Sequence, residues 1–226
     1  MRFIQKFVFF VCLVFGPVSQ AEIYDVSTTA ELREALASAA EAGGDNTIRL
    51  AAGTYSTQDD GEGTFNYLSQ QGGSLEVFGS EQSSVILDGD SLNSIFKVFD
   101  EAEQLTLSLN NLVFQNSLGD AFEITHAREV KITNTTFRLN KGGASVDIHR
   151  NVDEFSVTHS LFEGNEGECP ALRLIGPSDV TEITDSVFRE NEGSRAGAIC
   201  DFYDAVTYGA KINISESSFI DNVVST

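Results

Sequence analysis

A short pattern of apolar and polar positions repeats through the second half of the chain. Each copy ends in Phe, has an aliphatic residue five positions earlier, and in the last four copies has Asn three positions later. The phenylalanines are Phe114, Phe137, Phe162, Phe188 and Phe219, and the asparagines are Asn140, Asn165, Asn191 and Asn222. Successive phenylalanines are 23, 25, 26 and 31 residues apart. The pattern predicts short alternating strands joined by turns rich in Gly, Asn, Ser and Asp.

Units of this length predict a stack of coils, because a single coil cannot cover its own apolar face. We expect Phe to lie over Phe at the spacing of neighbouring strands, about 4.8 Å. We also expect the Asn amides to hydrogen-bond along the stack. A leucine-rich repeat would need the LxxLxLxxN signature and a helical segment between copies, and neither is found. A β-sandwich with coincidental spacing is the less favoured alternative.

One amphipathic helix is predicted near the amino terminus, over residues 29–42. Thr28 and Glu31 fit a capping box, apolar residues recur at helical spacing, and Gly43 with Gly44 ends the helix. Residues 47–50 then read as a strand. No second helix is predicted.

Residues 1–21 have the features of a secretory signal peptide. Arg2 and Lys6 precede an apolar run at 7–15, and small residues at Ser19 and Ala21 suit cleavage after Ala21. The run is shorter than the ~20 residues that a spanning helix needs. The sequence therefore predicts a secreted or cell-surface protein that does not span a membrane after cleavage.

Composition narrows the class of protein further. The chain has 34 acidic and 14 Lys or Arg residues, for a net charge of −20, and 41% hydrophobic residues. Because residues 1–21 hold two basic residues and no acidic ones, the remainder carries −22. This charge excludes a nucleic-acid partner, which requires a basic surface. The hydrophobic content excludes a disordered acidic tail.

From residue 22 onward the chain resembles the right-handed parallel β-helix superfamily, which includes pectate lyases, other polysaccharide lyases and bacterial surface proteins. The capped helix, TIRLAAGTY at 47–55 and GSLEVFGSEQSSVILDGD at 73–90 carry this resemblance. The FxxN copies are also similar to polymorphic outer membrane proteins of chlamydiae and to autotransporter passengers. Their second motif, GGA[ILV], is imperfect here at 142–145 and 196–199. The resemblance implies an all-β solenoid with an amino-terminal capping helix.

Alignment of the coils predicts which side chains share a surface. Alternate positions point inward, among them Leu172 with Leu174 and, in the next coil, Ala198 with Cys200. One outward row contains Lys97, Glu123, Asp147, Arg173 and Ile199. The next outward row contains Phe99, Thr125, His149, Ile175 and Asp201. The residues predicted to bind substrate are Glu123, Asp147, His149, Arg173 and Asp201.

Two roles remain open for these rows. Opposite charges on neighbouring strands stabilise a sheet by roughly 0.2–1 kcal/mol per pair, and this structural role is favoured. The resemblance to polysaccharide lyases implies instead that the acidic residues bind Ca²⁺ and that Arg173 binds a uronate carboxylate. No compact lyase motif is present, so no catalytic residue is assigned. No cofactor is required by the sequence, and Ca²⁺ is a candidate ligand.

The remaining polar and sulfur-containing residues favour structural roles. His126, His149 and His159 lack metal-binding spacing, and the acidic loop 59–63 reads as a solvated loop in preference to a Ca²⁺ site. A disulfide between Cys169 and Cys200 is predicted to be unlikely. Five extended residues from Cys169 to the inward column would span about 16 Å, whereas a disulfide needs Cα atoms within about 7 Å.

The sequence thus predicts a signal peptide at 1–21 and a parallel β-helix at 22–226. The cap covers 22–55, the coils cover about 56–226, and no closing C-terminal cap is evident. We expect a partner or a further segment to cover the last coil. The favoured function is a non-catalytic scaffold, adhesin-like or carbohydrate-binding, with a polysaccharide or cell-surface glycan as partner. The alternative is a polysaccharide lyase or glycoside hydrolase acting on acidic polysaccharide.

Overall fold

The structure is a computed structural model that describes residues 21–149, 151–175, 180–202 and 211–225. The predicted signal peptide lies outside these residues except for Ala21. Within the described ranges, no helix is long and apolar enough to cross a membrane.

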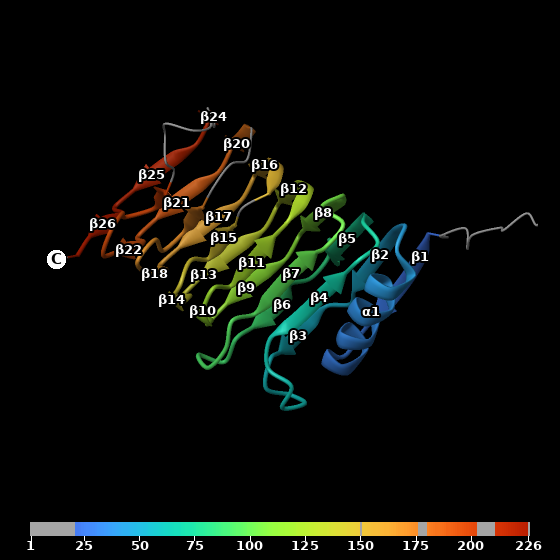
Figure 1. Cartoon of the computed structure of the whole chain (residues 1–226). Coiled ribbons are helices and arrows are strands. Elements are labelled where there is room, and N and C mark those ends of the chain that lie inside the picture. Colours follow the sequence, from blue (N-terminus) through green and yellow to red (C-terminus); the bar gives the residue numbers. More distant parts are fainter. Residues whose placement is uncertain (1–20, 150, 176–179, 203–210, 226) are drawn as a thin grey trace, which may run out of the picture.

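Helix α1 (Thr29–Ala42) is the only helix among the described residues, and it lies at the amino-terminal end of a long stack of strands (Figure 1). The predicted capping box is confirmed. The Thr28 hydroxyl accepts a hydrogen bond from the Glu31 backbone N–H at 3.2 Å, and the Glu31 carboxylate accepts one from the Thr28 N–H at 3.1 Å. The apolar face of the helix is buried at Leu32, Ala35, Leu36, Ala39 and Ala40. The helix therefore covers one end of the core.

Four parallel sheets, counted within the described residues, form the walls of the solenoid. The eight-stranded sheet contains β1 (Glu22–Val26), β2 (Asp45–Leu50), β5 (Gly73–Gly79), β8 (Leu105–Asn110), β12 (Ala127–Thr133), β16 (Val152–Thr158), β20 (Val180–Thr184) and β24 (Lys211–Ser215). The seven-stranded sheet contains β3 (Gly53–Ser56), β6 (Val85–Asp88), β9 (Val113–Gln115), β13 (Thr136–Arg138), β17 (Leu161–Glu163), β21 (Val187–Arg189) and β25 (Ser218–Ile220).

The six-stranded sheet contains β4 (Phe65–Ser69), β7 (Phe96–Asp100), β11 (Phe122–Thr125), β15 (Val146–Ile148), β19 (Leu172–Leu174) and β23 (Ile199–Asp201). The five-stranded sheet contains β10 (Leu118–Gly119), β14 (Lys141–Gly142), β18 (Glu166–Gly167), β22 (Glu192–Gly193) and β26 (Val223–Val224). Each full coil contributes one strand to each sheet, in the order β11, β12, β13, β14. This is the predicted all-β parallel β-helix with an amino-terminal helix.

The repeated phenylalanines form one continuous stack inside the solenoid. Neighbouring ring centroids from Phe114 to Phe219 are 4.9, 4.9, 4.6 and 4.8 Å apart. These distances match the spacing of neighbouring strands, about 4.8 Å. The first four rings are fully buried, and Phe219 in the last described coil is 46% exposed. The period of the repeat is therefore the period of the core.

The polar residue three positions before each repeated Phe occupies a left-handed turn. The φ angles in this column are 58° at Asn111, 49° at Asn134, 50° at His159, 49° at Asp185 and 51° at Glu216. Asn and Asp tolerate this conformation better than most residues because their short side chains bond locally. The column is polar because the backbone turns there.

The Asn column forms the predicted ladder. The side-chain N–H of Asn165 donates to Asn191 Oδ1 at 2.8 Å, and that of Asn140 donates to Asn165 Oδ1 at 3.1 Å. Each amide also bonds backbone groups, as the Asn165 amide does with Phe137 O at 3.1 Å. Asn140, Asn165 and Asn191 are buried. A second ladder joins backbone N–H groups to Ser hydroxyls, such as Thr135 N to Ser160 Oγ at 3.2 Å.

The acidic loop 59–63 is attached to α1. Arg33 Nε donates to Asp60 Oδ2 at 2.6 Å, and the guanidinium of Arg33 lies 4.5 Å from the centroid of the Phe65 ring. The Thr29 hydroxyl donates to Asp59 Oδ2 at 2.7 Å. The carboxylates of this loop therefore hold the cap helix against the first coils.

The predicted alignment of the last strand of the six-stranded sheet is wrong by one residue. The coil alignment placed Ile199 beside Arg173 and Asp201 beside Ile175. In the structure, Arg173 pairs with Cys200, and Asp201 pairs with Leu174. The carbonyl of Ala198 accepts hydrogen bonds from the N–H groups of two consecutive residues, Ala171 and Leu172, both at 3.2 Å. This two-to-one pairing is the pattern of a β-bulge.

A disulfide joins Cys169 and Cys200, with their Cα atoms 5.6 Å apart, so the prediction that this bond is unlikely is wrong. The prediction assumed an extended chain between Cys169 and Leu174. The chain instead bends at residues 168–171, which brings Cys169 into the interior beside the next coil.

Removing this disulfide is expected to lower the free energy of unfolding by about 2–4 kcal/mol, because the bond constrains a long loop of the unfolded chain. The two cysteines are 31 residues apart. Denaturant titration of a C169A/C200A variant, followed by circular dichroism, checks this. Reduction should destabilise the wild type and leave the variant unchanged. Equal stability of the variant and the oxidised wild type would contradict the prediction.

Candidate functional site

A column of charged side chains crosses the outer face of the six-stranded sheet. Register pairs Lys97 with Glu123, Glu123 with Asp147, and Asp147 with Arg173. These residues lie between inward-pointing apolar neighbours, as alternation along a strand requires. The predicted order of the four residues is confirmed. The next register partner of Arg173 is Cys200, whose side chain is buried, so the charged column does not continue onto β23.

Each cation in this column lies against a carboxylate. Lys97 Nζ is 2.6 Å from Glu123 Oε2. Arg173 Nε donates to Asp147 Oδ1 at 2.9 Å, and Arg173 Nη2 donates to Asp147 Oδ2. Asp147 is 0% exposed although it is on the outer face, because its neighbours cover it. Burial of this carboxylate is stabilised by a two-point contact with a guanidinium, the geometry that suits the pair best.

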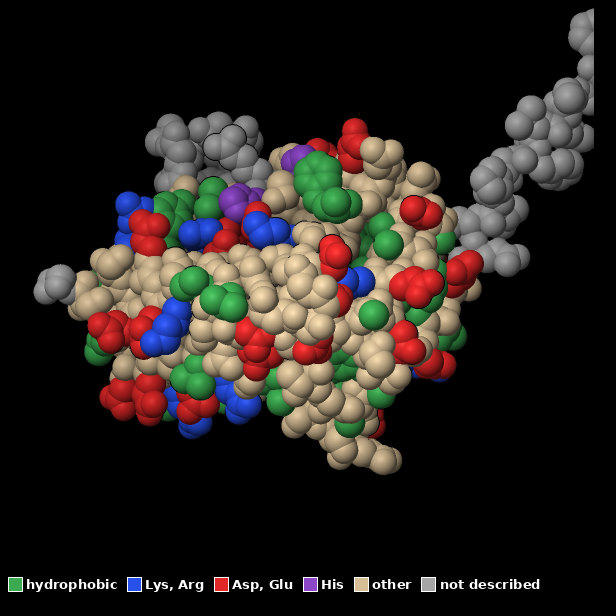
Figure 2. All heavy atoms as spheres, turned by 90° about the horizontal axis from the view of Figure 1, so that it is seen from below, with side chains coloured by type: hydrophobic (Ala, Val, Ile, Leu, Met, Phe, Trp, Pro, Cys, Tyr) green, Lys and Arg blue, Asp and Glu red, His purple; other side chains and the backbone are tan. Residues whose placement is uncertain are grey.

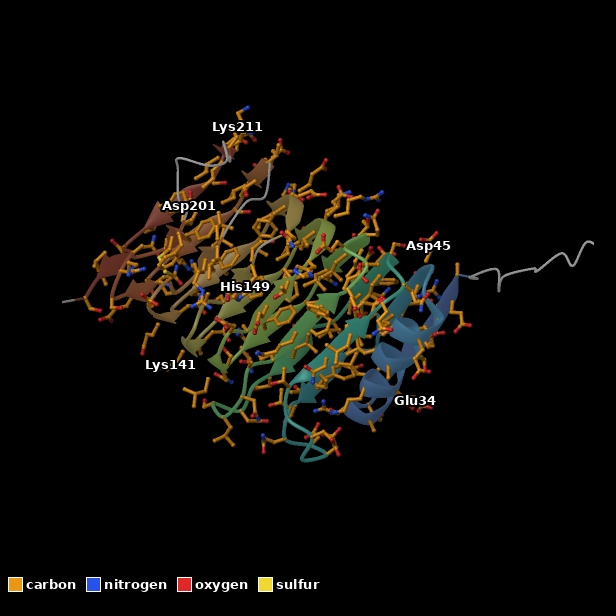
Figure 3. The ribbon with its side chains drawn as sticks, in the orientation of Figure 1. Glu34, Asp45, Lys141, His149, Asp201 and Lys211 are labelled. Atoms are coloured by element: carbon orange, nitrogen blue, oxygen red, sulfur yellow. A yellow bond between two sulfur atoms is a disulfide. The ribbon has the colours of Figure 1, made fainter. Side chains whose placement is uncertain are left out.

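His149 joins the same cluster from the end of β15. Its Nε2 lies 2.7 Å from Asp147 Oδ2 and 3.8 Å from Glu123 Oε1. Figure 3 shows His149 near the middle of the solenoid and Asp201 closer to its C-terminal coils. Asp201 lies in β23, two strands from β15. The structure thus brings Glu123, Asp147, His149 and Arg173 together, and Asp201 lies on β23, next to the strand that carries Arg173.

Asp120 belongs to the cluster and was missed by the sequence reasoning. Arg173 Nη2 donates to Asp120 Oδ1 at 3.2 Å, so one guanidinium contacts two carboxylates. Asp120 Oδ1 also accepts a hydrogen bond from the Ala144 N–H at 2.7 Å. Asp120 lies in the short link between β10, which ends at Gly119, and β11, which begins at Phe122, so alternation along a strand could not place it. The only signal was its position two residues before Phe122 in the coil alignment.

The cluster shifts the pKa values of its carboxyl groups in opposite directions. Burial alone would raise the pKa of Asp147, but hydrogen bonds from Arg173 and His149 outweigh it and hold that pKa below its usual value. Burial raises the pKa of Asp120, and the charge of Asp147 adds to this effect. The hydrogen bond with Asp147 raises the pKa of His149. The imidazole therefore holds its proton more firmly than usual.

The carboxylates of the column do not fit a Ca²⁺ site in this arrangement. Calcium needs six to eight oxygen ligands, whereas both oxygens of Asp147 face Arg173 or His149, and Glu123 faces Lys97. In the described part of the chain, no group of three or more His, Cys, Asp or Glu residues is arranged to hold a metal ion.

A second outward row runs beside the charged column. Leu68 pairs with Phe99, and Phe99 pairs with Thr125. His149 continues this row in the next coil. The rings of Phe99 and His126 are in contact, with centroids 5.2 Å apart. Figure 2 shows two histidine side chains at the upper edge of the molecule, where hydrophobic, basic and acidic side chains lie beside them.

Comparison with known proteins relates this chain to β-helix enzymes by fold alone. The crystal structure of pectate lyase Pel9A is similar with a TM-score of 0.54 at 15% identity, over 89% of this chain and 64% of that chain. A mannuronic acid specific polysaccharide family 6 lyase from human gut microbiota matches with a TM-score of 0.48 at 13% identity, over 88% of this chain and 59% of that chain. No family model and no curated protein sequence matches.

The chain spans less than two thirds of the length of either lyase. The likeness to Pel9A agrees with the sequence-based prediction, and the fold is a right-handed parallel β-helix.

Proposed function

We propose that this protein is a secreted or cell-surface β-helix scaffold that binds carbohydrate without catalysis. The binding face is the outer face of the six-stranded sheet, where charged and apolar rows run side by side. The observation that carries this proposal is that the charged side chains of the column neutralise one another. Lys97 forms an ion pair with Glu123, and Arg173 forms ion pairs with Asp147 and Asp120. An adhesin-like surface protein and a free secreted protein are both compatible with this function.

The arrangement favours binding over elimination chemistry. A lyase needs a base that can take a proton from the sugar and a cation that neutralises its carboxylate. Asp147 is fully buried with both oxygens engaged. Because its pKa is raised by the contact with Asp147, His149 is a weak candidate for the base. Arg173 is shared by two carboxylates of the protein itself.

A polysaccharide lyase or glycoside hydrolase acting on acidic polysaccharide is the second candidate. The observation that favours it is the opposite displacement of the pKa values of Asp120 and Asp147 on either side of Arg173. Neighbouring titratable groups whose environments separate their pKa values are typical of acid–base catalysis. In this candidate, Asp120 is the proton donor.

The full chain should bind glycans on an array and should not degrade them. Polygalacturonate, alginate and uncharged glycans are incubated with and without Ca²⁺, and unsaturated uronate and new reducing ends are measured. Turnover that is lost in Asp120→Asn and kept in Glu163→Gln would contradict the non-catalytic scaffold and support the enzyme. Glu163 is a suitable control because it pairs with Arg189 on the seven-stranded sheet, away from the cluster.

A further inference from the structure

An exposed apolar ledge lies on the same face as the charged cluster. It consists of Leu68, Phe99 and the imidazole ring of His126. Leu68 is 65% exposed and Phe99 is 37% exposed, and the two residues are register partners on adjacent strands. His126 supports the Phe99 ring from the side, at an interplanar angle of 40°. The proposed binding face therefore has a contiguous apolar surface beside a row of hydrogen-bonding groups.

We propose that this ledge is a binding subsite for an uncharged hexopyranose unit, whose C–H face stacks on the ring of Phe99. The proposal rests on the carbohydrate-binding function and names the class of ligand. A pyranose has one apolar face and a rim of hydroxyl groups, so it matches a surface that is apolar in one row and polar in the next. Sites of this kind combine aromatic area with a few polar groups that fix orientation.

The polar groups needed for the hydroxyl rim lie in the charged column. Asn66, Lys97 and Glu123 are consecutive register partners there, each two residues before its neighbour in the ledge row, so they point to the same side of the sheet. Lys97 donates hydrogen bonds, Glu123 accepts them, and Asn66 does both. The hydroxyl groups along one edge of a sugar that stacks on Phe99 can thus form hydrogen bonds with these three side chains.

Charge in the cluster selects an uncharged ligand. Glu123, Asp147 and Asp120 face Lys97, Arg173 and His149. These cations are engaged by carboxylates of the protein, and the whole chain carries −20. An anionic sugar is therefore repelled by the overall field and would have to displace an internal partner.

The ledge row runs across the strands, so a bound glycan runs along the axis of the solenoid. Successive positions Leu68, Phe99 and Thr125 are one strand spacing apart, about 4.8 Å. Each added sugar unit contacts a further strand. Affinity should therefore rise with the length of the oligosaccharide until the row is filled.

The test is isothermal titration of the full chain with uncharged β-1,4-linked gluco-, manno- and galacto-oligosaccharides of increasing length, and with oligogalacturonate. The wild type should bind at least one uncharged series, and Phe99→Ala should weaken that binding about tenfold, which corresponds to the loss of one aromatic stacking contact. Phe99→Tyr keeps the ring and should retain affinity. Leu118→Ala is the matched control, because Leu118 is 53% exposed on the five-stranded sheet. Thermal unfolding shows that each variant is folded.

The outcomes separate this inference from the proposed function. Binding of uncharged oligosaccharide that is unchanged in Phe99→Ala overturns the ledge and leaves carbohydrate binding in place. Binding of oligogalacturonate alone overturns the choice of an uncharged ligand and also leaves carbohydrate binding in place. Binding of no oligosaccharide in the panel, together with no signal on the glycan array, overturns both.

Discussion

Replacing Asn165 with Ala should lower the free energy of unfolding by about 4 kcal/mol, since each buried polar group left without a partner costs about 1–3 kcal/mol. The Asn165 side chain accepts hydrogen bonds from Asn140 N and Nδ2, both at 3.1 Å. It donates to Phe137 O at 3.1 Å and to Asn191 Oδ1 at 2.8 Å. Asn165 is 0% exposed, so water cannot replace these bonds. Denaturant titration followed by circular dichroism measures the loss.

The matched control is Asn222→Ala, which removes the same side chain from the same ladder in the last described coil. Asn222 accepts a hydrogen bond from Asn191 Nδ2 at 2.8 Å and donates one to Phe188 O at 2.8 Å. It is half-buried, so water can satisfy the groups it leaves. We expect its loss to cost less than half as much as that of Asn165. Equal costs at the two positions would show that the ladder contributes through the turn conformation and not through burial of the amides.

The repeat can be recognised in the sequence because every coil must place the same kind of side chain at the same position of the core. Phe137 and Phe162 stack because their strands are in register, and a one-residue shift would move each ring to the outer face. The same periodicity is enough to place Lys97, Glu123 and the residues that follow them in one column. Positions that the core dictates can therefore be predicted from spacing alone.

The features that were missed lie where the backbone leaves the strands. Asp120 lies in the link between β10 and β11, and Cys169 lies in a bent segment, so neither position is on a strand where alternation applies. The bulge at Ala198 shifts the last strand by one residue, which moves Ile199 out of the charged column. The burial of Asp147 was also not predictable, because it results from how its neighbours fold over it. Spacing gives the direction of a side chain but not what covers it.

Asp147→Ala should lower the free energy of unfolding by about 3–5 kcal/mol near pH 5, because removing one member of a buried ion pair leaves the other charge uncompensated. Arg173 has a side chain only 19% exposed, and it loses two of its hydrogen bonds in this variant. Glu163→Gln is the matched control. It removes the carboxylate of another cross-strand pair, with Arg189, whose side chains are 30% and 43% exposed. An exposed pair of this kind contributes about 1 kcal/mol or less.

The stability difference between wild type and Asp147→Ala should depend on pH in a defined window. The pKa of Asp147 is lowered in the folded state, so its contribution is present above the unfolded value, about 4, and is lost as pH falls through the folded pKa. The pKa of His149 is raised, so its contribution is complete below about 6.5 and is lost as pH rises through the folded pKa. The difference should therefore be largest between about pH 4 and pH 6.5. Denaturant titrations across pH measure it, and a difference that grows steadily above this window would contradict the pairing of Asp147 with His149.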